Sequence, residues 1–383
     1  MALTTLPTAA FATGSVGTSQ LADGAVTTEK LVADVNFRNL IINGDMTVSQ
    51  RGTTQTGVTS TAYGEWCDRW NFDASSAGTW TLSQSSTVPT GQGFGYSLKY
   101  DCTTADASLG ASDYVALRTL LEAQNLQQLK YGTSNAESLT LSFWVRSNKT
   151  GTYIVWFYAD DGNRTISKAY TINSADTWEK KTITIDGDTA GTINNDNGIG
   201  FRVNFFLGAG SNYTSGTLAS SWQTDSNSIR AAGQVNLADN TANEWYITGV
   251  QLEVGTSASD FEFLPYDVNL QRCKRYFQRI WMNRSDNNFW GPQRYFDANN
   301  VILGETWFSP EMRTQPSFSY TGTPIIKNNG GGVTGWTGIT GGQLSNTRAE
   351  VQFIKTGHGL TNSNTLAANL SDSSTFFKYD AEL

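Results

Sequence analysis

Two segments of the chain place aromatic, arginine and asparagine side chains at positions suited to ligand binding. Residues 139–145 and 199–207 alternate between apolar and other side chains, the period of a strand with one buried face. If the apolar positions point into a core, four residues point away from it: Trp144, Arg146, Arg202 and Asn204. An indole ring stacks on a sugar, while arginine and asparagine bind its hydroxyl groups. The pattern predicts a glycan site, with packing against a neighbouring subunit or domain as the alternative.

The titratable side chains do not have the arrangement of a catalytic site. The single histidine, His358, lies between two glycines, and no G-x-S-x-G sequence accompanies it, which argues against a Ser–His–Asp triad. Asp160, Asp161, Asp186 and Asp188 lie in predicted turns, where aspartate is favoured by its own hydrogen bonds. We therefore expect no enzyme. A polysaccharide depolymerase is the alternative, because the two carboxylates of a glycosidase can come from distant strands.

The same turns offer oxygen ligands to a cation. Residues 160–163 are Asp-Asp-Gly-Asn and residues 186–188 are Asp-Gly-Asp, and such hard ligands suit calcium, although neither run matches an EF-hand loop. The three cysteines are widely spaced and show no metal-ligand spacing. We expect free, buried thiols, no metal site and no cofactor, with a structural calcium ion as the alternative.

Composition excludes several classes of protein. The net charge is −8 and only 16% of the residues are charged, so binding of nucleic acid through its phosphates is not expected. No apolar run reaches the ~18 residues that cross a bilayer, so we expect no membrane insertion. The first residues have neither the basic start nor the apolar run of a signal peptide, which predicts a protein made in the cytoplasm.

Strand patterns fill the central part of the chain. Residues 153–158 are apolar on both faces, which predicts a strand covered on both sides. Residues 114–122 predict a strand that is followed by a helical turn at 125–129. The alternation changes phase at the dipeptide Thr248-Gly249, which predicts a β-bulge. Many short strands with close turns predict an all-β jelly-roll sandwich.

A helical spacing of apolar residues follows the sandwich. Leu270, Cys273, Phe277 and Ile280 recur at steps of three and four, and Asp267 is a candidate N-cap. The opposite face carries arginines, which predicts a solvated or interface-facing helix, with an anion site as the alternative. Four parts are expected: an extended N-terminal stalk (1–37), the jelly-roll domain (38–268), a connecting helix (269–280) and a smaller β-rich C-terminal domain (281–383).

The N-terminal segment contains an internal repeat. Residues 16–25 are echoed by residues 26–35, with valine, threonine and leucine recurring in register. A segment with so few large apolar residues cannot bury a core alone. Identical copies packed side by side would allow each leucine to meet its symmetry mates. We expect contacts between copies at four positions, with a disordered linker as the alternative: Val16, Leu21, Val26 and Leu31.

Several short motifs resemble those of tailed-bacteriophage fibre-type virion proteins with a carbohydrate-binding-like jelly-roll module. The resemblance covers about residues 14–280. It rests on the opening and closing motifs of the module, on the segment that follows it and on the end of the first repeat: residues 39–46, 50–52, 68–70, 245–255, 260–262, 265–266, 270–277 and 21–28.

This resemblance implies a structural virion protein, and we expect a tail fibre subunit that mediates adhesion to the host surface. It implies a surface appendage of the virion, a homotrimer, attachment to other virion proteins through residues 1–37 and contact with a host-surface glycan. A capsid decoration or head-fibre protein without receptor binding is the alternative. Weak contacts at several copies would add up through their effective concentration.

Removal of residues 1–37 is expected to reduce the mass in solution from that of an oligomer to that of a monomer. The reason is that the stalk supplies the contacts between copies. Light scattering on the full and the shortened chain measures both masses. A monomeric full chain would contradict the stalk.

Overall fold

A computed structural model describes most of the chain beyond the N-terminal stalk. The four predicted stalk contacts, Val16, Leu21, Val26 and Leu31, lie outside the described residues and stay predictions. The described residues are 37–281, 294–295, 300–322, 324–328, 331–333, 337–358, 367–370 and 376–383.

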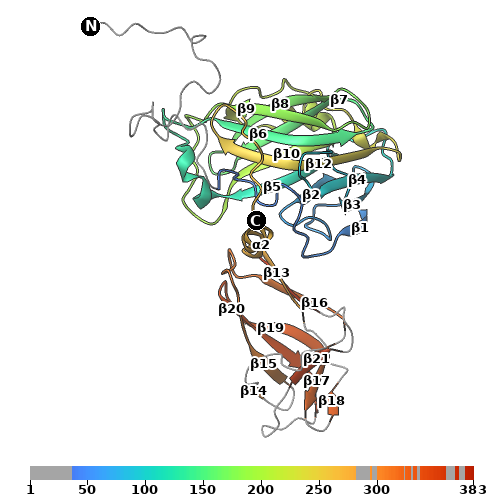
Figure 1. Ribbon diagram of the computed structural model, residues 1–383, viewed down its shortest axis with the longest axis vertical. Coiled ribbons are helices and arrows are strands. Elements are labelled where there is room, and N and C mark those ends of the chain that lie inside the picture. Colours follow the sequence, from blue (N-terminus) through green and yellow to red (C-terminus); the bar gives the residue numbers. More distant parts are fainter. Residues whose placement is uncertain are drawn as a thin grey trace, which may run out of the picture.

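Two six-stranded antiparallel sheets form the larger body of the molecule (Figure 1). The first sheet has the strand order β1 (Thr54–Val58), β3 (Thr79–Ser85), β4 (Ser97–Thr104), β12 (Glu244–Val254), β6 (Leu139–Ser147), β9 (Glu179–Ile185). The second sheet has the strand order β11 (Gln223–Thr224), β8 (Arg164–Ile172), β7 (Gly151–Ala159), β10 (Ile199–Ala209), β5 (Tyr114–Glu122), β2 (Asn71–Ser75).

The chain crosses repeatedly between the two sheets. It passes from β4 to β5, back to β6, on to β7, and later from β8 to β9 and from β9 to β10. Neighbours within a sheet therefore come from distant parts of the chain, as where β12 pairs with both β4 and β6. Such crossing is the connectivity of a double-sheet jelly roll. The predicted all-β jelly-roll sandwich is confirmed.

Aromatic rings fill much of the core between the sheets. The ring of Tyr100 lies 6.0 Å from that of Trp80 and 5.9 Å from that of Trp245, between centroids. Large rings bury much apolar surface for few rotatable bonds, so the many tryptophans of the sequence stabilise the sandwich by filling its core. Four indole side chains are completely buried: Trp66, Trp70, Trp80 and Trp245.

Strand β12 bulges where the sequence pattern changes phase. Its pairing with β6 shifts register between Thr248 and Gln251, as predicted. Gly249 adopts a φ of +61°, a conformation that costs free energy for residues with a Cβ. A Cβ at this position would lie 2.5 Å from the ring of Phe94. The extra residue keeps the apolar side chains on both sides of the bulge in the core.

Helices are few and short in the sandwich. The predicted helical turn after β5 is the 3-10 helix η4 (Ala123–Leu129), which buries Leu126 and Leu129. Between β10 and β12 the chain forms three further short elements besides β11: α1 (Ser211–Thr214), η5 (Asn227–Ile229) and η6 (Leu237–Asp239).

The connecting helix is shorter than the apolar spacing predicts. Helix α2 (Tyr266–Lys274) begins after Pro265, and Asp267 lies in its first turn rather than at the N-cap. The chain then enters β13 (Phe277–Trp281), which pairs with β22 (Phe376–Asp380). The expected helix over 269–280 is therefore wrong beyond Lys274, because the partner strand lies far along the chain and leaves no trace in the local spacing.

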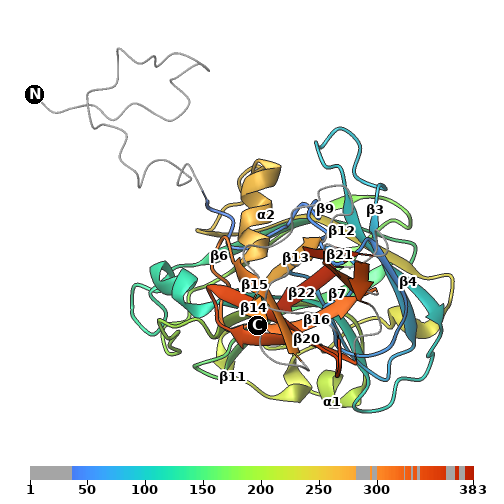
Figure 2. The same cartoon turned by 90° about the horizontal axis from the view of Figure 1, so that it is seen from below.

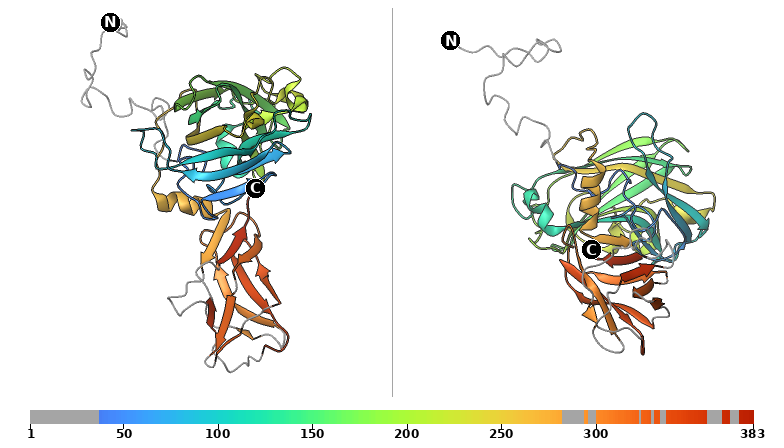
Figure 3. Two further views of the ribbon diagram at one scale, coloured as in Figure 1. Left: turned by 90° about the vertical axis from the view of Figure 1, so that its right-hand side faces the viewer. Right: turned by 60° about the horizontal axis from the view of Figure 1, so that its bottom comes forward.

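The C-terminal strands form a smaller β-rich body at one end of the sandwich, and α2 lies at the junction (Figure 3). The strands of this body not yet given are β14 (Arg294–Tyr295), β15 (Asn300–Trp307), β16 (Ser317–Thr321), β17 (Pro324–Asn328), β18 (Gly331–Val333), β19 (Gly338–Leu344), β20 (Arg348–Ile354) and β21 (Ala367–Leu370). The described strands form three sheets, with the orders β13-β22-β16, β14-β15-β20-β19 and β18-β17-β21. Seen from below, β13, β22 and β16 lie in front of the sandwich (Figure 2).

No helix among the described residues is long and apolar enough to cross a membrane.

The substitution Gly249→Ala is expected to lower the free energy of unfolding by about 2–4 kcal/mol, because backbone strain adds to a clash with Phe94. Gly57→Ala is the matched control: Gly57 has a φ of +70°, but a Cβ there meets nothing within 4 Å. Urea unfolding measures both variants. Equal losses would contradict tight packing at the bulge.

Candidate functional site

The four predicted glycan-binding residues do not form one site. Trp144 and Arg146 lie on β6 in the first sheet, whereas Arg202 and Asn204 lie on β10 in the second. Both pairs alternate with core residues and point away from the core, as predicted. Since the two sheets pack face to face, their outward sides are on opposite sides of the sandwich. The alternation gives the phase of each strand but not the sheet to which it belongs.

We call the surface around Arg202 and Asn204 the second-sheet face. In the pairing of the strands, Arg202 is opposite Tyr158, and Asn204 lies between Trp156 and Arg118. Strand β2 borders β5 and adds polar side chains to the same face. The outward residues of four adjacent strands form this face: Asn71, Asp73, Tyr114, Ala116, Arg118, Leu120, Trp156, Tyr158, Arg202, Asn204 and Phe206.

Asp73 is the buried centre of this face. Its carboxylate accepts hydrogen bonds from Arg118 Nη1 at 3.0 Å, from Asn204 Nδ2 at 3.2 Å and from the hydroxyl of Tyr114 at 3.1 Å. Burial and the neighbouring Asp73 raise the pKa of Tyr114 to about 12, which keeps this hydroxyl a donor. Arg118 also binds Asn71, so its guanidinium is held at two points. The middle of the face is therefore rigid.

Arg202 supplies a fixed, partly exposed cation beside Tyr158. Its Nε donates to Asp160 Oδ2 at 2.7 Å and its Nη2 to the other carboxylate oxygen, and this hydrogen bonding raises the pKa of Arg202. Its guanidinium carbon lies 5.5 Å from the centroid of the Tyr158 ring. The side chain keeps 26% of its surface exposed. Arg202 can thus offer donors to a ligand without losing its position.

The two aromatic rings next to Arg202 have different roles. Trp156 is only 6% exposed, donates its indole N–H to Thr165 Oγ1, and lies 4.5 Å from the guanidinium of Arg230. Tyr158 is half-buried, and its hydroxyl donates to Asn163 Oδ1 at 3.0 Å. Trp156 supports the face, and Tyr158 is the ring that a ligand can reach. Sequence analysis missed Tyr158, because residues 153–158 are apolar on both faces.

Trp144 and Arg146 lie on the outward side of the first sheet. Arg146 donates to Asp176 Oδ1 at 2.8 Å, and its guanidinium lies 4.9 Å from the ring of Tyr246. Asp176 is 57% exposed, so solvent screens this ion pair. The partners of Arg118 and Arg202, by contrast, are Asp73 and Asp160, which are 7% and 18% exposed. The second-sheet face is therefore the better organised of the two.

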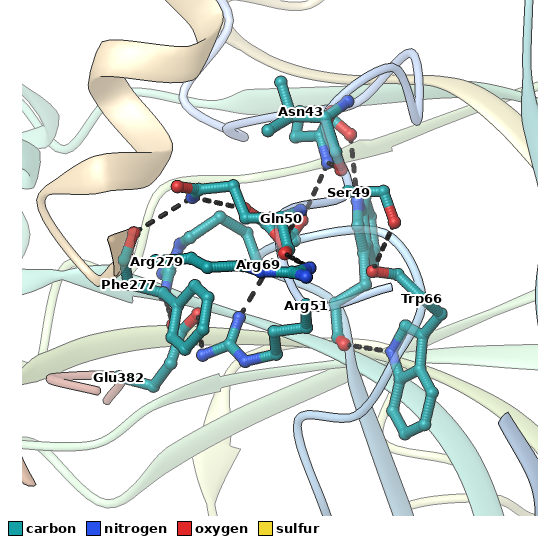
Figure 4. A network of polar contacts seen from close by, with 12 residues as sticks. Asn43, Ser49, Gln50, Arg51, Trp66, Arg69, Phe277, Arg279 and Glu382 are labelled. Atoms are coloured by element: carbon teal, nitrogen blue, oxygen red, sulfur yellow. Dashed lines mark hydrogen bonds and ion pairs between the residues drawn. The ribbon is translucent and has the colours of Figure 1, made fainter. Parts of the chain in front are cut away.

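The motifs on which the fibre resemblance rests have structural roles (Figure 4). Arg51 donates to Asp380 Oδ2 at 2.9 Å, and its guanidinium carbon lies 3.8 Å from the ring centroid of Phe277. Arg69 forms an ion pair with Glu382. These contacts join the start of the sandwich to the last residues of the chain. We call Arg51, Arg69, Asp380 and Glu382 the arginine clamp.

The opening motif also anchors helix α2. Asn43 donates through Nδ2 to the carbonyl oxygens of Val48 and Asp68, at 2.9 and 2.8 Å. Its backbone N–H donates to Asn269 Oδ1 on α2 at 3.2 Å, and Asn269 donates in turn to Asp45 Oδ1 at 3.1 Å. Burial raises the pKa of Asp45. This motif therefore holds the helix to the sandwich.

The acidic turns pair with the protein itself. Asp161 accepts hydrogen bonds from Asn194, and Asp188 forms an ion pair with Arg164 at 2.9 Å. Among the described residues, no group of three or more histidine, cysteine, aspartate or glutamate side chains is placed to hold a metal ion. The calcium alternative stays a prediction. His358, the histidine that the sequence gives no role, is buried and follows β20. The three cysteines are free and buried, as predicted: Cys67, Cys102 and Cys273.

The substitution Glu382→Ala is expected to lower the free energy of unfolding by about 3–5 kcal/mol, because it leaves the buried Arg69 without its anion. Glu137→Ala is the matched control: Glu137 pairs with Lys130 where both side chains are exposed, and the expected loss is below about 1 kcal/mol. Urea unfolding compares the two. A loss as small as that of the control would show that the clamp contributes little to stability.

Comparison with known proteins finds no matching family model and no matching curated protein. Solved structures match a little over half of the chain at low identity. The enzymatically active domain of tailspike protein 4 of bacteriophage CBA120 is 11% identical over 57% of this chain and 22% of its own, with a TM-score of 0.30. A putative sugar binding protein from Bacteroides thetaiotaomicron is 12% identical over 57% of this chain and 100% of its own, with a TM-score of 0.32. TmCBM61 in complex with β-1,4-galactotriose is 14% identical over 57% of this chain and 100% of its own, with a TM-score of 0.29.

Proposed function

We propose that this chain is a fibre-type structural protein of a tailed-phage virion and that its sandwich binds host-surface carbohydrate through the second-sheet face. The observation that carries the proposal is the group of Arg202, Asp160 and Tyr158 on that face, whose side chains contact one another. Arg202 is held by two hydrogen bonds to Asp160 and keeps part of its surface exposed. A half-buried ring stands beside it.

This arrangement suits the two surfaces of a sugar. The C–H face of a pyranose packs on an aromatic ring, and its hydroxyl groups bind charged donors and acceptors at the edge. Tyr158 offers the ring, Arg202 offers donors, and Asp160 offers acceptor capacity. Because the partners are already ordered, binding costs little side-chain entropy. One such site is weak, and a homotrimeric fibre carries three that act together.

Two other roles remain as alternatives. A decoration or head-fibre protein would use the sandwich only as a rigid body and would bind no host sugar. A depolymerase would need one protonated acid and one charged carboxylate across a glycosidic bond. The carboxylates of the face, Asp73 and Asp160, each form an ion pair with an arginine that holds them in place. This pairing supports binding rather than hydrolysis.

The test is binding of the full chain to an array of bacterial surface polysaccharides. Arg202→Ala and Tyr158→Ala are expected to weaken binding about 10–100-fold, the effect of losing a charged hydrogen bond or a stacking ring. Arg146→Ala, on the outward side of the first sheet, is the matched control and is expected to bind as the unchanged chain does. Circular dichroism checks that each variant folds.

Four outcomes would contradict the proposal. Binding that survives both second-sheet variants excludes this face. Loss of binding in Arg146→Ala alone moves the site to the first sheet. Absence of binding on the array and on whole host cells favours the architectural role. Release of reducing ends from a bound polysaccharide would favour the depolymerase.

A further inference from the structure

A cavity of about 330 Å³ lies where β5, η4, α2 and the first described residues meet. Its volume is at the lower end of the range for sites that bind small organic molecules. It shares no residue with the open end of the second-sheet face at Arg202 and Tyr158. The residues that line it combine charged, amide and apolar side chains, and the ones used below are Leu40, Arg69, Glu122, Arg272, Arg275 and Asn125.

Three arginines and one carboxylate line the cavity, and two of the arginines are neutralised. Arg275 binds both oxygens of the buried Glu122, at 2.9 and 2.6 Å. Arg69 forms an ion pair with Glu382, a member of the arginine clamp outside the cavity. Arg272 is the third. In a chain of net charge −8, this grouping of positive charge needs a local explanation.

No carboxylate oxygen in the described part of the chain lies within 4.0 Å of the Arg272 guanidinium, and the carboxylate that interacts with it electrostatically, Glu262, is farther away. Its hydrogen bond is to the backbone oxygen of Asn39, at 3.2 Å. Burial lowers the pKa of Arg272, which reflects the cost of keeping the charge away from water. An anion in the cavity would offset that cost.

Arg69 adds a second positive charge to the lining. It is 2% exposed, donates to Glu382 and to the backbone oxygen of Leu120, and interacts electrostatically with Arg272. Its charge adds to the positive potential of the cavity, and Arg272 is the guanidinium that can donate to a planar carboxylate there.

The rest of the lining suits a sugar ring. The half-buried Leu40 offers apolar surface to the C–H groups, and the exposed amides of Asn125 and Gln128 can bind hydroxyls. We propose that this cavity binds a sugar acid, with the carboxylate of a hexuronic acid against Arg272 and its hydroxyls against the amides. The cavity contains neither Arg202 nor Tyr158, but it borders the second-sheet face, because Leu120 in its lining is opposite Arg202 in the pairing of β5 with β10.

Calorimetric titration of the full chain with D-glucuronate and D-galacturonate tests this inference, with D-glucose and acetate as comparison ligands. At least one uronate is expected to bind with a millimolar dissociation constant, and both comparison ligands at least ten times more weakly. Arg272→Gln is expected to weaken uronate binding at least tenfold. Arg146→Gln is the matched control, and Tyr158→Ala should leave uronate binding unchanged.

The contrary results are equally defined. Equal binding of glucose and uronate would exclude a role for the charge, and equal binding of acetate would exclude recognition of the sugar. Uronate binding that is unchanged in Arg272→Gln would overturn the site. Absence of binding of either uronate at concentrations up to about 50 mM would overturn it as well. Loss of uronate binding in Tyr158→Ala would assign it to the second-sheet face instead.

Discussion

The arginine clamp is the interaction on which the relation between the two bodies depends. Arg69 and Glu382 lie 313 residues apart in the chain and are 2% and 5% exposed. Burial of two charges costs free energy that only a well-placed partner offsets, so such a pair specifies geometry more than it adds stability. The guanidinium of Arg69 also lies 3.5 Å from the ring centroid of Tyr276, just after α2. The clamp thus fixes the last strand and the linker to the sandwich together.

This role changes what the fibre-like motifs indicate. Gln50 and Arg51 bind the C-terminal body, and Asn43 binds α2. These side chains are used for architecture, so the motifs carry information on how a sandwich is joined to the next domain. They say nothing on which ligand the sandwich takes. The proposed ligand contacts come from residues outside the motifs, Tyr158 and Arg202.

Local pattern predicted the strands well because period two follows directly from burial of one face. The strand at 199–207, the bulge after Thr248 and the turn after β5 are all set by neighbours close in sequence. The local pattern could not predict which strands pair with one another. The change from helix to strand at Phe277 depends on β22, and the separation of Arg146 from Arg202 depends on how the chain crosses between sheets.

The same limit explains why the proposed binding surface differs from the one predicted from the sequence. The outward-pointing Trp144 was predicted to be the ring that stacks on a sugar. The accessibility of such a ring depends on which side chains pack over it, and the local pattern does not show this. On the second-sheet face Arg230 lies against Trp156, and the less conspicuous Tyr158 stays accessible. Trp156 and the ion-paired Arg202 hold the side chains around Tyr158 in place. Ligand binding there costs little side-chain entropy, which favours affinity more than a larger ring without ordered neighbours would. If the chain is the proposed fibre subunit, avidity requires that every copy present the same site geometry, and the hydrogen bonds of Asp73 and Asp160 hold the arginines of that site in place.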